Sequence, residues 1–381
     1  MKVAIIGQDM FAQGAQFVCA MMTKAFVSRG YEVDLLLSKV QQDYIDEGRD
    51  NQFPVPPETH VMIMGSRHAR QCVPEIRRYL KTTDAVVMIS MSWNYAVALR
   101  LASFGLKNFP RLVYVEHGLI GYENSGVIKP DVRKLSAKGL MSGLLWSPFH
   151  RILTVSHKGA DDFKRMNPWF PREKIVCVNN PVVDDCFFPK AAQLPTHPWL
   201  KERNGEWKTF ITAGAYQPYK AHRYLLEAMK IIAGKRAKVR CVIFGQGPLE
   251  SEYRKFISDN KLEDYISVGG YVKNFPAEAN AAFGFVLSST AESFGIVLVE
   301  ALACGCRIVS SDPPFGPREI LADGKYGTLV PSADAGALAE GMVAAAKQSR
   351  GPNPRESWER YTMDIAVDRY ADAIGIPRWA N

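Results

Sequence analysis

The chain has 381 residues, 47% of them hydrophobic, which is enough for a large core and favours two domains of ordinary size. Its apolar runs fall short of the roughly 20 residues that a membrane-spanning helix needs, so no such helix is predicted. The net charge is +8, yet no basic run with interleaved aromatic residues occurs, and nucleic acid is not expected as a partner.

Short apolar strands alternate with helical stretches in the first half of the chain. The first strand, at 2–7, starts so close to the N-terminus that no signal peptide is expected. A loop to Gly14 and a helix to about Arg29 are predicted to follow it. Further strands are predicted at 31–37, 84–90, 111–117, 151–157 and 174–180. Nearly continuous Val, Ile and Leu runs between helices are typical of a parallel sheet covered on both faces.

A second set of strands follows a Pro-rich, irregular stretch that suits a linker (179–207). These strands are predicted at 208–214, 239–245, 265–270, 283–289 and 306–312. The sequence therefore predicts an α/β fold with two doubly wound parallel-sheet domains, 1–182 and 183–357. The helical tail, within 358–381, is a candidate to pack back on the first domain. Ligands of such sheets lie outside the carboxyl ends of the strands.

The excess of positive charge lies in the first half: residues 1–180 contain 23 Lys and Arg against 16 Asp and Glu, and the remainder 24 against 23. Part of it lies in 129–151, where cations bracket an apolar stretch. A basic amphipathic segment suits an anionic membrane surface or a phosphate-bearing lipid. A core helix with solvated ends is the alternative, and the segment alone slightly favours it. The cations are Lys129, Arg133, Lys134, Lys138 and Arg151, and the apolar residues are Leu140, Met141, Leu144, Leu145 and Trp146.

Seven cysteines occur at spacings that match no disulfide framework. Most lie in apolar runs and are expected to be reduced core thiols of a cytosolic protein. Cys304 and Cys306 form a lone CxC without a second pair or a histidine cluster, so no metal is expected there.

One carboxylate interrupts an apolar run: every residue of 296–302 is apolar except Glu300. A helix is predicted to begin near Ser293 or Phe294, with Gly295 in its first turn, where exposed N–H groups favour a phosphate. Glu300 then lies roughly 10 Å further along the helix. A buried carboxylate is unfavourable without partners, and the two hydroxyls of a ribose would supply donors.

A second acid, Glu292, lies eight residues before Glu300 in the preceding loop, where it is placed to face a sugar at the other end of a diphosphate. The alternative is that Glu292 is a helix-start acid and that Glu300 pairs with a nearby arginine. That alternative is favoured for either residue alone. The two acids together, with Ser-Phe-Gly between them, favour a ligand site.

The stretch "ESFGIVLVEALACG" resembles the E-x7-E signature of the retaining glycosyltransferases of family 4, with Glu292 and Glu300 as its two acids. The resemblance covers nearly the whole chain and implies the GT-B fold, two Rossmann-like domains that bind a nucleotide sugar between them. Other stretches that resemble the family are "IIGQDMFAQGAQFVCAMMTKAFVSRGYEVDLLL", "TVSHKGADDF", "NNPVVDDCF", "AGAYQPYKAHRYLLEAM", "FGQGPLESEYRKF", "SVGGYVKN" and "GPREILADGKYGTLVP".

The resemblance implies that Lys220 contacts the donor diphosphate, where a cation neutralises the departing phosphate. The arginine that the family usually places five residues earlier is Ala215 in this chain, so half of the expected phosphate clamp is absent. Arg223 and Arg318 are candidates to replace it.

The remaining implied site residues are spread over both domains. His117, at a strand end, is expected near the donor sugar, and the backbone of Val272 is expected to pair with the base. The loop at Gly14 and the tight turn at Gly245 are expected to admit the donor close to the backbone. The donor contacts at the helix start are expected to come from Ser293, Phe294, Gly295 and Ile296.

The resemblance implies a hexosyl- or N-acetylhexosaminyltransferase that moves a sugar, with retention, from a nucleotide sugar to a lipid-linked, polysaccharide or lipopolysaccharide acceptor. A UDP-sugar is the favoured donor. No DxD-like acid pair occurs, so neither a metal nor a cofactor is expected. We expect a cytoplasmic protein that contacts the inner face of the membrane through 129–151. Two alternatives remain: a nucleotide-sugar epimerase, which the E-x7-E block argues against, and a non-catalytic nucleotide-sugar-binding subunit, which Ala215 supports.

Overall fold

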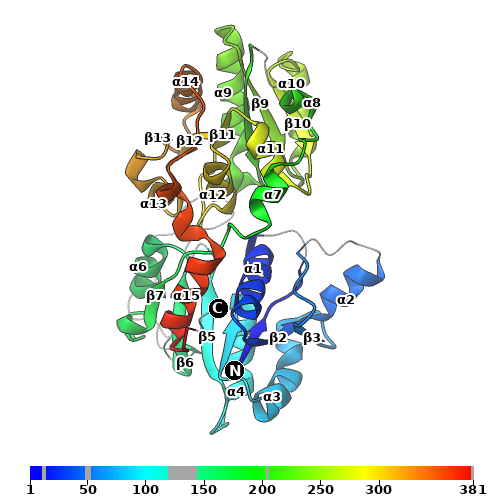
Figure 1. Ribbon diagram of the computed structural model, residues 1–381, viewed down its shortest axis with the longest axis vertical. Helices are drawn as coiled ribbons and strands as arrows, with labels where there is room; N and C mark the ends of the chain where they lie inside the picture. Colours follow the sequence, from blue (N-terminus) through cyan, green and yellow to red (C-terminus); the bar gives the residue numbers. More distant parts are fainter. Residues whose placement is uncertain (11–13, 48–52, 119–142, 144, 203–205, 379–381) are drawn as a thin grey trace. The chain divides into compact units, whose positions relative to one another are not determined.

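The computed structural model describes residues 1–10, 14–47, 53–118, 143, 145–202 and 206–378. The described residues form two compact units. The first contains the chain up to Val182 and from Tyr361 onward, and the second contains Val183–Arg360. Each unit has one parallel sheet with helices on both faces (Figure 1), which confirms the predicted α/β fold.

The first sheet has seven strands in the order β3-β2-β1-β4-β5-β6-β7, all parallel. Val3 of the central strand pairs with Val33 on one side and Val87 on the other. The strand order therefore reverses between β1 and β4, the point where doubly wound sheets bind ligands. The strands are β1 (Lys2–Ile6), β2 (Glu32–Leu37), β3 (His60–Ile63), β4 (Val87–Ser90), β5 (Arg111–Glu116), β6 (Phe149–Thr154) and β7 (Ile175–Cys177).

The helix α15 (Met363–Ile374) belongs to the first unit although it follows the second in sequence. It packs against α1 and β6. Arg29 faces Asp364 and Asp368 of α15, and Arg151 of β6 donates to the Ala373 carbonyl at 3.1 Å. The other helices of this unit are α1 (Gly14–Ser28), α2 (Lys39–Asp46), α3 (Val73–Thr82), α4 (Trp93–Ser103) and α6 (His157–Met166), with 3-10 turns at Ala69–Cys72 and Arg172–Lys174.

The second sheet has six parallel strands in the order β10-β9-β8-β11-β12-β13, so its order reverses between β8 and β11. The strands are β8 (Lys208–Ala213), β9 (Val239–Phe244), β10 (Ile266–Gly270), β11 (Gly284–Leu287), β12 (Arg307–Ser311) and β13 (Thr328–Val330). The helices are α7 (Phe187–Ala191), α8 (Pro198–Lys201), α9 (His222–Gly234), α10 (Glu250–Asp259), α11 (Phe275–Ala281), α12 (Ile296–Ala303), α13 (Pro317–Ile320) and α14 (Ala335–Ala346), with 3-10 turns at Pro218–Lys220, Ala322–Gly324, Arg355–Ser357 and Glu359–Tyr361.

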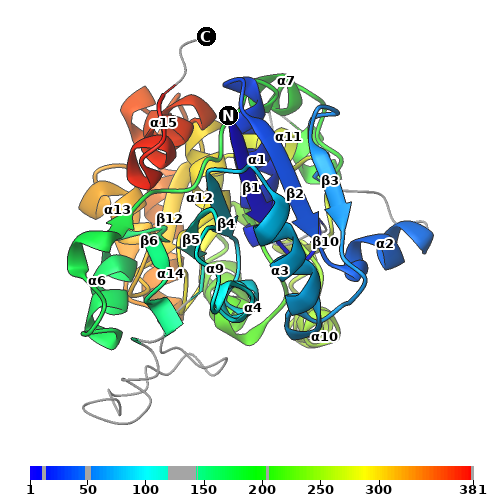
Figure 2. The same cartoon turned by 90° about the horizontal axis from the view of Figure 1, so that it is seen from below.

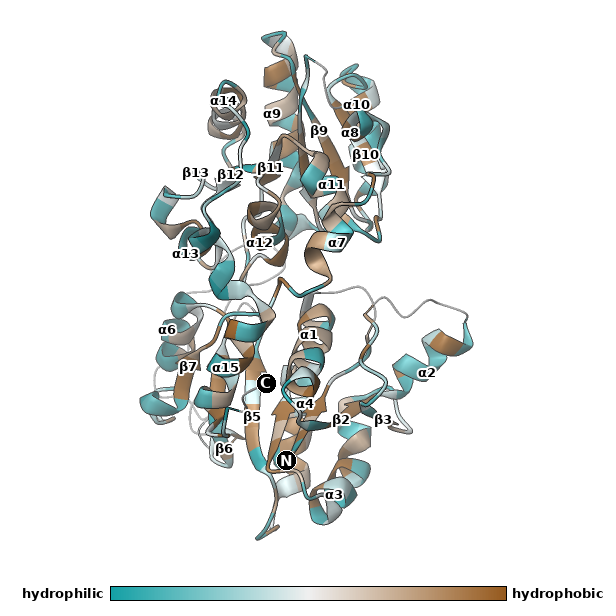
Figure 3. Cartoon of the chain, viewed as in Figure 1, coloured by the Kyte–Doolittle hydropathy of each residue, from teal (hydrophilic) through white to brown (hydrophobic). Residues whose placement is uncertain are grey.

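The core of each unit lies on its sheet, where most residues of the central strands are apolar (Figure 3). All six residues of β9 are buried, and so are all four of β4. Burial on both faces explains why these strands read as nearly continuous apolar runs rather than as an alternating pattern.

Two strands and two helices depart from the sequence-based expectation. The strands β3 and β13 were not predicted; each lies at a sheet edge, as Figure 2 shows for β3 beside β2, and each is short and partly exposed. The predicted linker contains α7 and α8, and it is held to the second unit by Glu278, which accepts hydrogen bonds from the amide and hydroxyl of Thr196. The stretch is therefore part of that unit's packing.

Only the end of the basic segment 129–151 is described, because residues 119–142 and 144 lie outside the described residues. The membrane-contact prediction for those positions therefore has no structural counterpart. Trp146 is fully buried, stacks on Tyr114 with a centroid distance of 5.1 Å, and donates its indole N–H to Asn167. It belongs to the core and not to an apolar face on the surface. No helix of the described chain has the length and apolar character to cross a membrane.

All seven cysteines are free thiols, as expected; five are buried, Cys177 is half-buried and Cys186 is exposed.

Candidate functional site

An ion pair lies where the strand order of the second sheet reverses. Lys220 ends the 3-10 turn after β8, and Glu292 lies in the loop after β11, the neighbouring strand. Lys220 Nζ lies 2.6 Å from Glu292 Oε1. Because the carboxyl ends of adjacent parallel strands meet at one sheet edge, two residues 72 positions apart come together at the usual ligand position of this fold.

The pair is nearly dry, with the side chains of Lys220 and Glu292 only 15% and 8% exposed. Burial acts to lower the pKa of Lys220, but the Glu292 carboxylate outweighs it and holds the pKa above its ordinary value. The same oxygen of Glu292 accepts a hydrogen bond from Ser289 Oγ at 2.8 Å. Lys220 is therefore a fixed, fully charged ammonium group.

The loops after β8 and β11 are tied together beside this pair. Thr290 donates its amide to the Tyr219 carbonyl at 3.0 Å, and Ser288 donates its hydroxyl to the Lys220 carbonyl. Ala221, the residue after the lysine, has φ 52 and ψ 33, a left-handed conformation that is unfavourable for a residue with a Cβ. The backbone is thus strained at Ala221, the residue that directly follows Lys220.

The helix α12 begins at Ile296, two to three residues later than predicted. Gly295 is its N-cap and not part of its first turn, and its φ of 109 explains why the helix does not extend further back. The amide groups of Ile296 and Val297 have no partner among the described residues, so this helix start retains free donors. Gly316 lies against it, and a Cβ there would overlap the carbonyl oxygen of Phe294.

Glu300 lies in the middle of α12 and is half-buried. Its carboxylate makes no hydrogen bond or ion pair within the described residues, so the arginine partner considered above is not found there. Burial raises the pKa of Glu300 to about 8, against a smaller opposing effect of the Lys190 charge. Near neutral pH this carboxyl group is therefore largely protonated.

The raised pKa of Glu300 predicts a pH-dependent stability. Between the ordinary value of 4.5 and about 8 the folded protein keeps a proton that the unfolded chain releases. The stability that the fold gains from protonated Glu300 is therefore fully present below the unfolded pKa, and it is lost as the pH rises to about 8. We expect Glu300→Gln to raise the free energy of unfolding by about 1–2 kcal/mol at about pH 8, a value below the full effect because the side chain is partly exposed, and to leave it nearly unchanged at about pH 4. Urea unfolding at both pH values measures this, with the exposed Glu227→Gln as control; equal gains at both would contradict it.

The other predicted donor-side residues lie at the same sheet edge or just beyond it. Val272 follows β10 and is half-buried, and Gly245 follows β9 directly. Ser293, which is half-buried, and Phe294, which is buried, precede the N-cap of α12.

Both candidate replacement arginines are already engaged. Arg223 is exposed and stacks on the Tyr224 ring at 4.6 Å. Arg318 pairs with Asp312 and Asp323, and the pKa of its guanidinium is raised, chiefly by the hydrogen bond to Asp312. The replacement for the missing arginine at Ala215 is thus not apparent from either side chain.

His117 and Gly14 belong to the first unit. His117 follows β5, burial lowers its pKa to about 4, and its Nε2 has no hydrogen-bond partner among the described residues. A neutral imidazole with an unused nitrogen is available to a ligand. Gly14 is exposed and is the first residue of α1.

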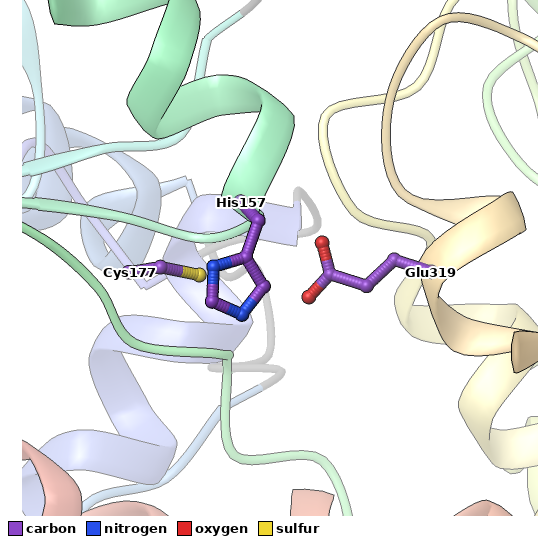
Figure 4. Close-up of side chains that lie close together, drawn as sticks. All are labelled: His157, Cys177 and Glu319. Atoms are coloured by element: carbon purple, nitrogen blue, oxygen red, sulfur yellow. The ribbon is translucent and has the colours of Figure 1, made fainter.

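Figure 4 shows His157, the first residue of α6, beside Cys177, the last residue of β7. Their potential ligand atoms lie within 4.8 Å of each other. Two ligands in one unit are fewer than the three that a catalytic zinc requires. Glu319, drawn in the same view, belongs to the second unit. The expectation of no metal stays a prediction.

Sequence reasoning missed the residues that hold the ion pair. Ser289, whose hydroxyl donates to Glu292, lies two residues after β11 and three before that acid, and its position at the end of the predicted strand 283–289 was the available signal. Tyr219, whose carbonyl ties the two loops together, had no sequence signal.

Two family models match the chain and together cover most of it. The model for glycosyltransferase family 4 matches residues 12–185, and the model for glycosyl transferases group 1 matches residues 196–363. The phosphatidyl-myo-inositol mannosyltransferase of Mycobacterium leprae is 36% identical over 141 residues, which are 36% of this chain and 37% of the relative.

A Campylobacter jejuni enzyme, N-acetylgalactosamine-N,N'-diacetylbacillosaminyl-diphospho-undecaprenol 4-alpha-N-acetylgalactosaminyltransferase, is 30% identical over 136 residues, 35% of this chain and 36% of the relative. The chain thus matches less than half the length of these curated relatives. The structure of Anabaena HepE, solved with UDP and glucose, has a TM-score of 0.73 at 16% identity and covers 98% of this chain and 99% of that one. With both halves matched in order by the two models and the fold shared along nearly its whole length, the chain belongs to the glycosyltransferases of family 4, with the GT-B fold.

Proposed function

We propose that this glycosyltransferase moves a hexosyl or N-acetylhexosaminyl group from a UDP-sugar to a lipid-linked or cell-surface polysaccharide acceptor, with retention at the anomeric carbon. The names of the relatives support this acceptor class, since one includes a diphospho-undecaprenol and another phosphatidyl-myo-inositol. HepE, solved with UDP and with UDP-glucose, supports the donor. We assign donor binding to the second unit, acceptor binding to the first, and the reaction to the cytoplasmic face of the membrane.

The observation that carries the proposal is the Glu300 carboxylate, half-buried and without a partner in the described structure. An unpaired buried carboxyl group destabilises a fold unless a ligand supplies its hydrogen-bond partners. The free amides at the start of α12 suit a phosphate, and the distance along the helix to Glu300 suits the ribose that follows. A nucleoside diphosphate satisfies both groups at once.

Lys220 is the cation that we assign to neutralise the negative charge developing on the leaving diphosphate. Its ammonium group is held by Glu292 at the switch point of the sheet. When the anomeric bond breaks, charge accumulates on the leaving diphosphate, and a preorganised cation is worth on the order of 3 kcal/mol of barrier. The acceptor hydroxyl attacks the same face of the sugar, and the departing phosphate takes its proton, so no separate base is assigned.

The protonated state of Glu300 gives a direct test of nucleotide binding. Ribose hydroxyls donate to the ionised form, so UDP is expected to lower the pKa of Glu300 and to release close to one proton at about pH 7. Calorimetric titration in two buffers of different ionisation enthalpy measures this number. Glu300→Gln should abolish the release and weaken UDP binding at least about tenfold. If the variant released as many protons on UDP binding as the wild type, the assignment of Glu300 to the ribose would be wrong.

Product analysis then tests the reaction. Incubation of a UDP-sugar with lipid-linked and polysaccharide acceptors is expected to release UDP only when an acceptor is present, and the anomeric coupling in the NMR spectrum of the product reports retention. Conversion of the donor without an acceptor would identify an epimerase. Tight binding without turnover on any acceptor would identify a binding subunit.

A further inference from the structure

A buried acid that the proposed reaction does not use lies at the carboxyl end of β5. Glu116 is the last residue of that strand, is 8% exposed, and pairs through its backbone with Thr154 of β6. Burial raises the pKa of its carboxyl group, against smaller opposing effects of two hydrogen bonds. Because a buried acid is unfavourable without partners, the position of those two bonds indicates what Glu116 does.

The Glu116 side chain closes a ring around the residue that follows it. Its Oε1 accepts a hydrogen bond from the Gly118 amide at 2.7 Å. Tyr114, two residues earlier in β5, donates its hydroxyl to the same carboxylate. Sheet pairing fixes the backbone at Glu116, and the bond to the side chain fixes it at Gly118. His117 is the one residue between them, so this bond sets the backbone angles that aim its imidazole.

Gly118 is fitted closely to the same carboxylate. A Cβ on Gly118 would lie 2.8 Å from Glu116 Oε1, closer than real Cβ atoms approach another atom. The φ of Gly118 is not in the left-handed region, so the backbone itself would accept alanine. It is therefore the contact with Glu116 that favours glycine here, and a methyl group would push the carboxylate off the amide.

The local reach of Glu116 differs from that of a buried acid in the second unit. Glu278 accepts hydrogen bonds from Thr196, 82 positions away, and so joins two distant segments. Within the described chain, the side chain of Glu116 bonds only to its own strand and to the turn that follows. Its effect is therefore concentrated on the strand end at which His117 lies.

We propose that Glu116 is a positioning residue, which holds His117 in the orientation that its imidazole needs to meet the donor sugar. The Nε2 atom of His117 is buried and has no hydrogen-bond partner among the described residues, so one nitrogen is kept for a ligand. The inference rests on the proposed function and deepens it, because it names the group that controls a sugar contact from within the first unit.

The first test is an NMR titration of the seven histidines of the full chain, with His117→Asn to assign the signal. Burial lowers the pKa of His117 to about 4 in the wild type, so its ring should not titrate in the neutral range. Glu116→Ala should release the turn, admit water to the imidazole and let it titrate close to its ordinary value of 6.5. Gly118→Ala should act in the same direction although it keeps the acid.

Glu75→Ala is the matched control for this titration. Glu75 accepts a hydrogen bond from the amide of another glycine of the same unit, Gly65, at 3.1 Å. Its loss should leave the titration of His117 unchanged. The proposal is wrong if His117 titrates as in the wild type in either Glu116→Ala or Gly118→Ala, or if Glu75→Ala shifts it as much as they do.

The second test is a double-mutant cycle on sugar transfer. Glu116→Ala and His117→Ala should each lower kcat about tenfold or more, and the double variant should lose no more than His117→Ala alone, because Glu116 acts through His117. The Kd for UDP should stay that of the wild type throughout, since the nucleotide is assigned to the second unit. Losses that multiply in the double variant would overturn the proposal. A wild type that transfers no sugar would instead contradict the proposed function, and the titration would still decide whether Glu116 holds His117.

Discussion

Replacing Lys220 by methionine is expected to lower the free energy of unfolding by about 3 kcal/mol or more, because it leaves the buried Glu292 carboxylate without its counter-ion. The methionine keeps most of the side-chain volume, so packing against Gly214, whose backbone lies beside the lysine stem, changes little. Urea denaturation at neutral pH measures the loss.

The double variant Lys220→Met, Glu292→Gln separates stability from function. Removing the stranded charge should restore the free energy of unfolding to within about 1 kcal/mol of the wild type, while turnover stays reduced about 100-fold or more because no cation faces the leaving diphosphate. The control is Lys325→Met: its pair with Glu356 has an N–O distance of 2.8 Å, but both side chains are 60% exposed. That variant should keep the stability of the wild type, because solvent screens an exposed ion pair. Similar losses for the buried and the exposed lysine would refute the buried-pair interpretation.

Gly316→Ala is expected to be the most damaging single methyl addition near the helix start of α12. Its φ of 77 is unfavourable for alanine, and the added Cβ would overlap the Phe294 carbonyl oxygen, so the 293–296 backbone must move. Strain and displacement together should lower the free energy of unfolding by about 3 kcal/mol or more and raise the Kd for UDP at least about tenfold. Thermal unfolding and nucleotide titration measure the two effects.

Gly324→Ala is the control that tests the effect of a positive φ alone, without steric overlap. Gly324 also has a positive φ, 98, but nothing lies within 4 Å of an added Cβ. This variant should lose only about 1 kcal/mol and keep its UDP affinity. If the two alanine variants behave alike, crowding at Phe294 is not what requires glycine at 316.

The buried strands were predictable because burial on both faces leaves a continuous apolar signature. β9 and β4 were recognised for this reason, and their predicted ranges include the observed ones. β13 has three residues, with Thr328 exposed, and β3 is exposed over most of its length. Such exposed residues leave no apolar run in the sequence, so these two edge strands gave little signal, whereas the edge strands β7 and β10 lie within predicted ranges.

The site was predictable only in part. Glu300 was identifiable because a carboxylate inside an apolar helix is unfavourable in any fold. The contact of Lys220 with Glu292 was not, because it depends on which two strands are neighbours and the residues are 72 positions apart. The start of α12 was placed too early because Ser293 resembles an N-cap, whereas the positive φ of Gly295 decides where the helix begins.

The return of α15 to the first unit has a consequence for biosynthesis. During translation the strands of the first unit emerge from the ribosome long before α15, so α1 and β6 await a partner while the whole second unit is made. Until then Arg29 and Arg151 lack their contacts and the apolar surface under the helix is open to solvent. The Val183–Arg360 segment of the second unit is complete before α15 is made and can mature first, so the nascent chain is most exposed to aggregation and proteolysis at its earliest-made end.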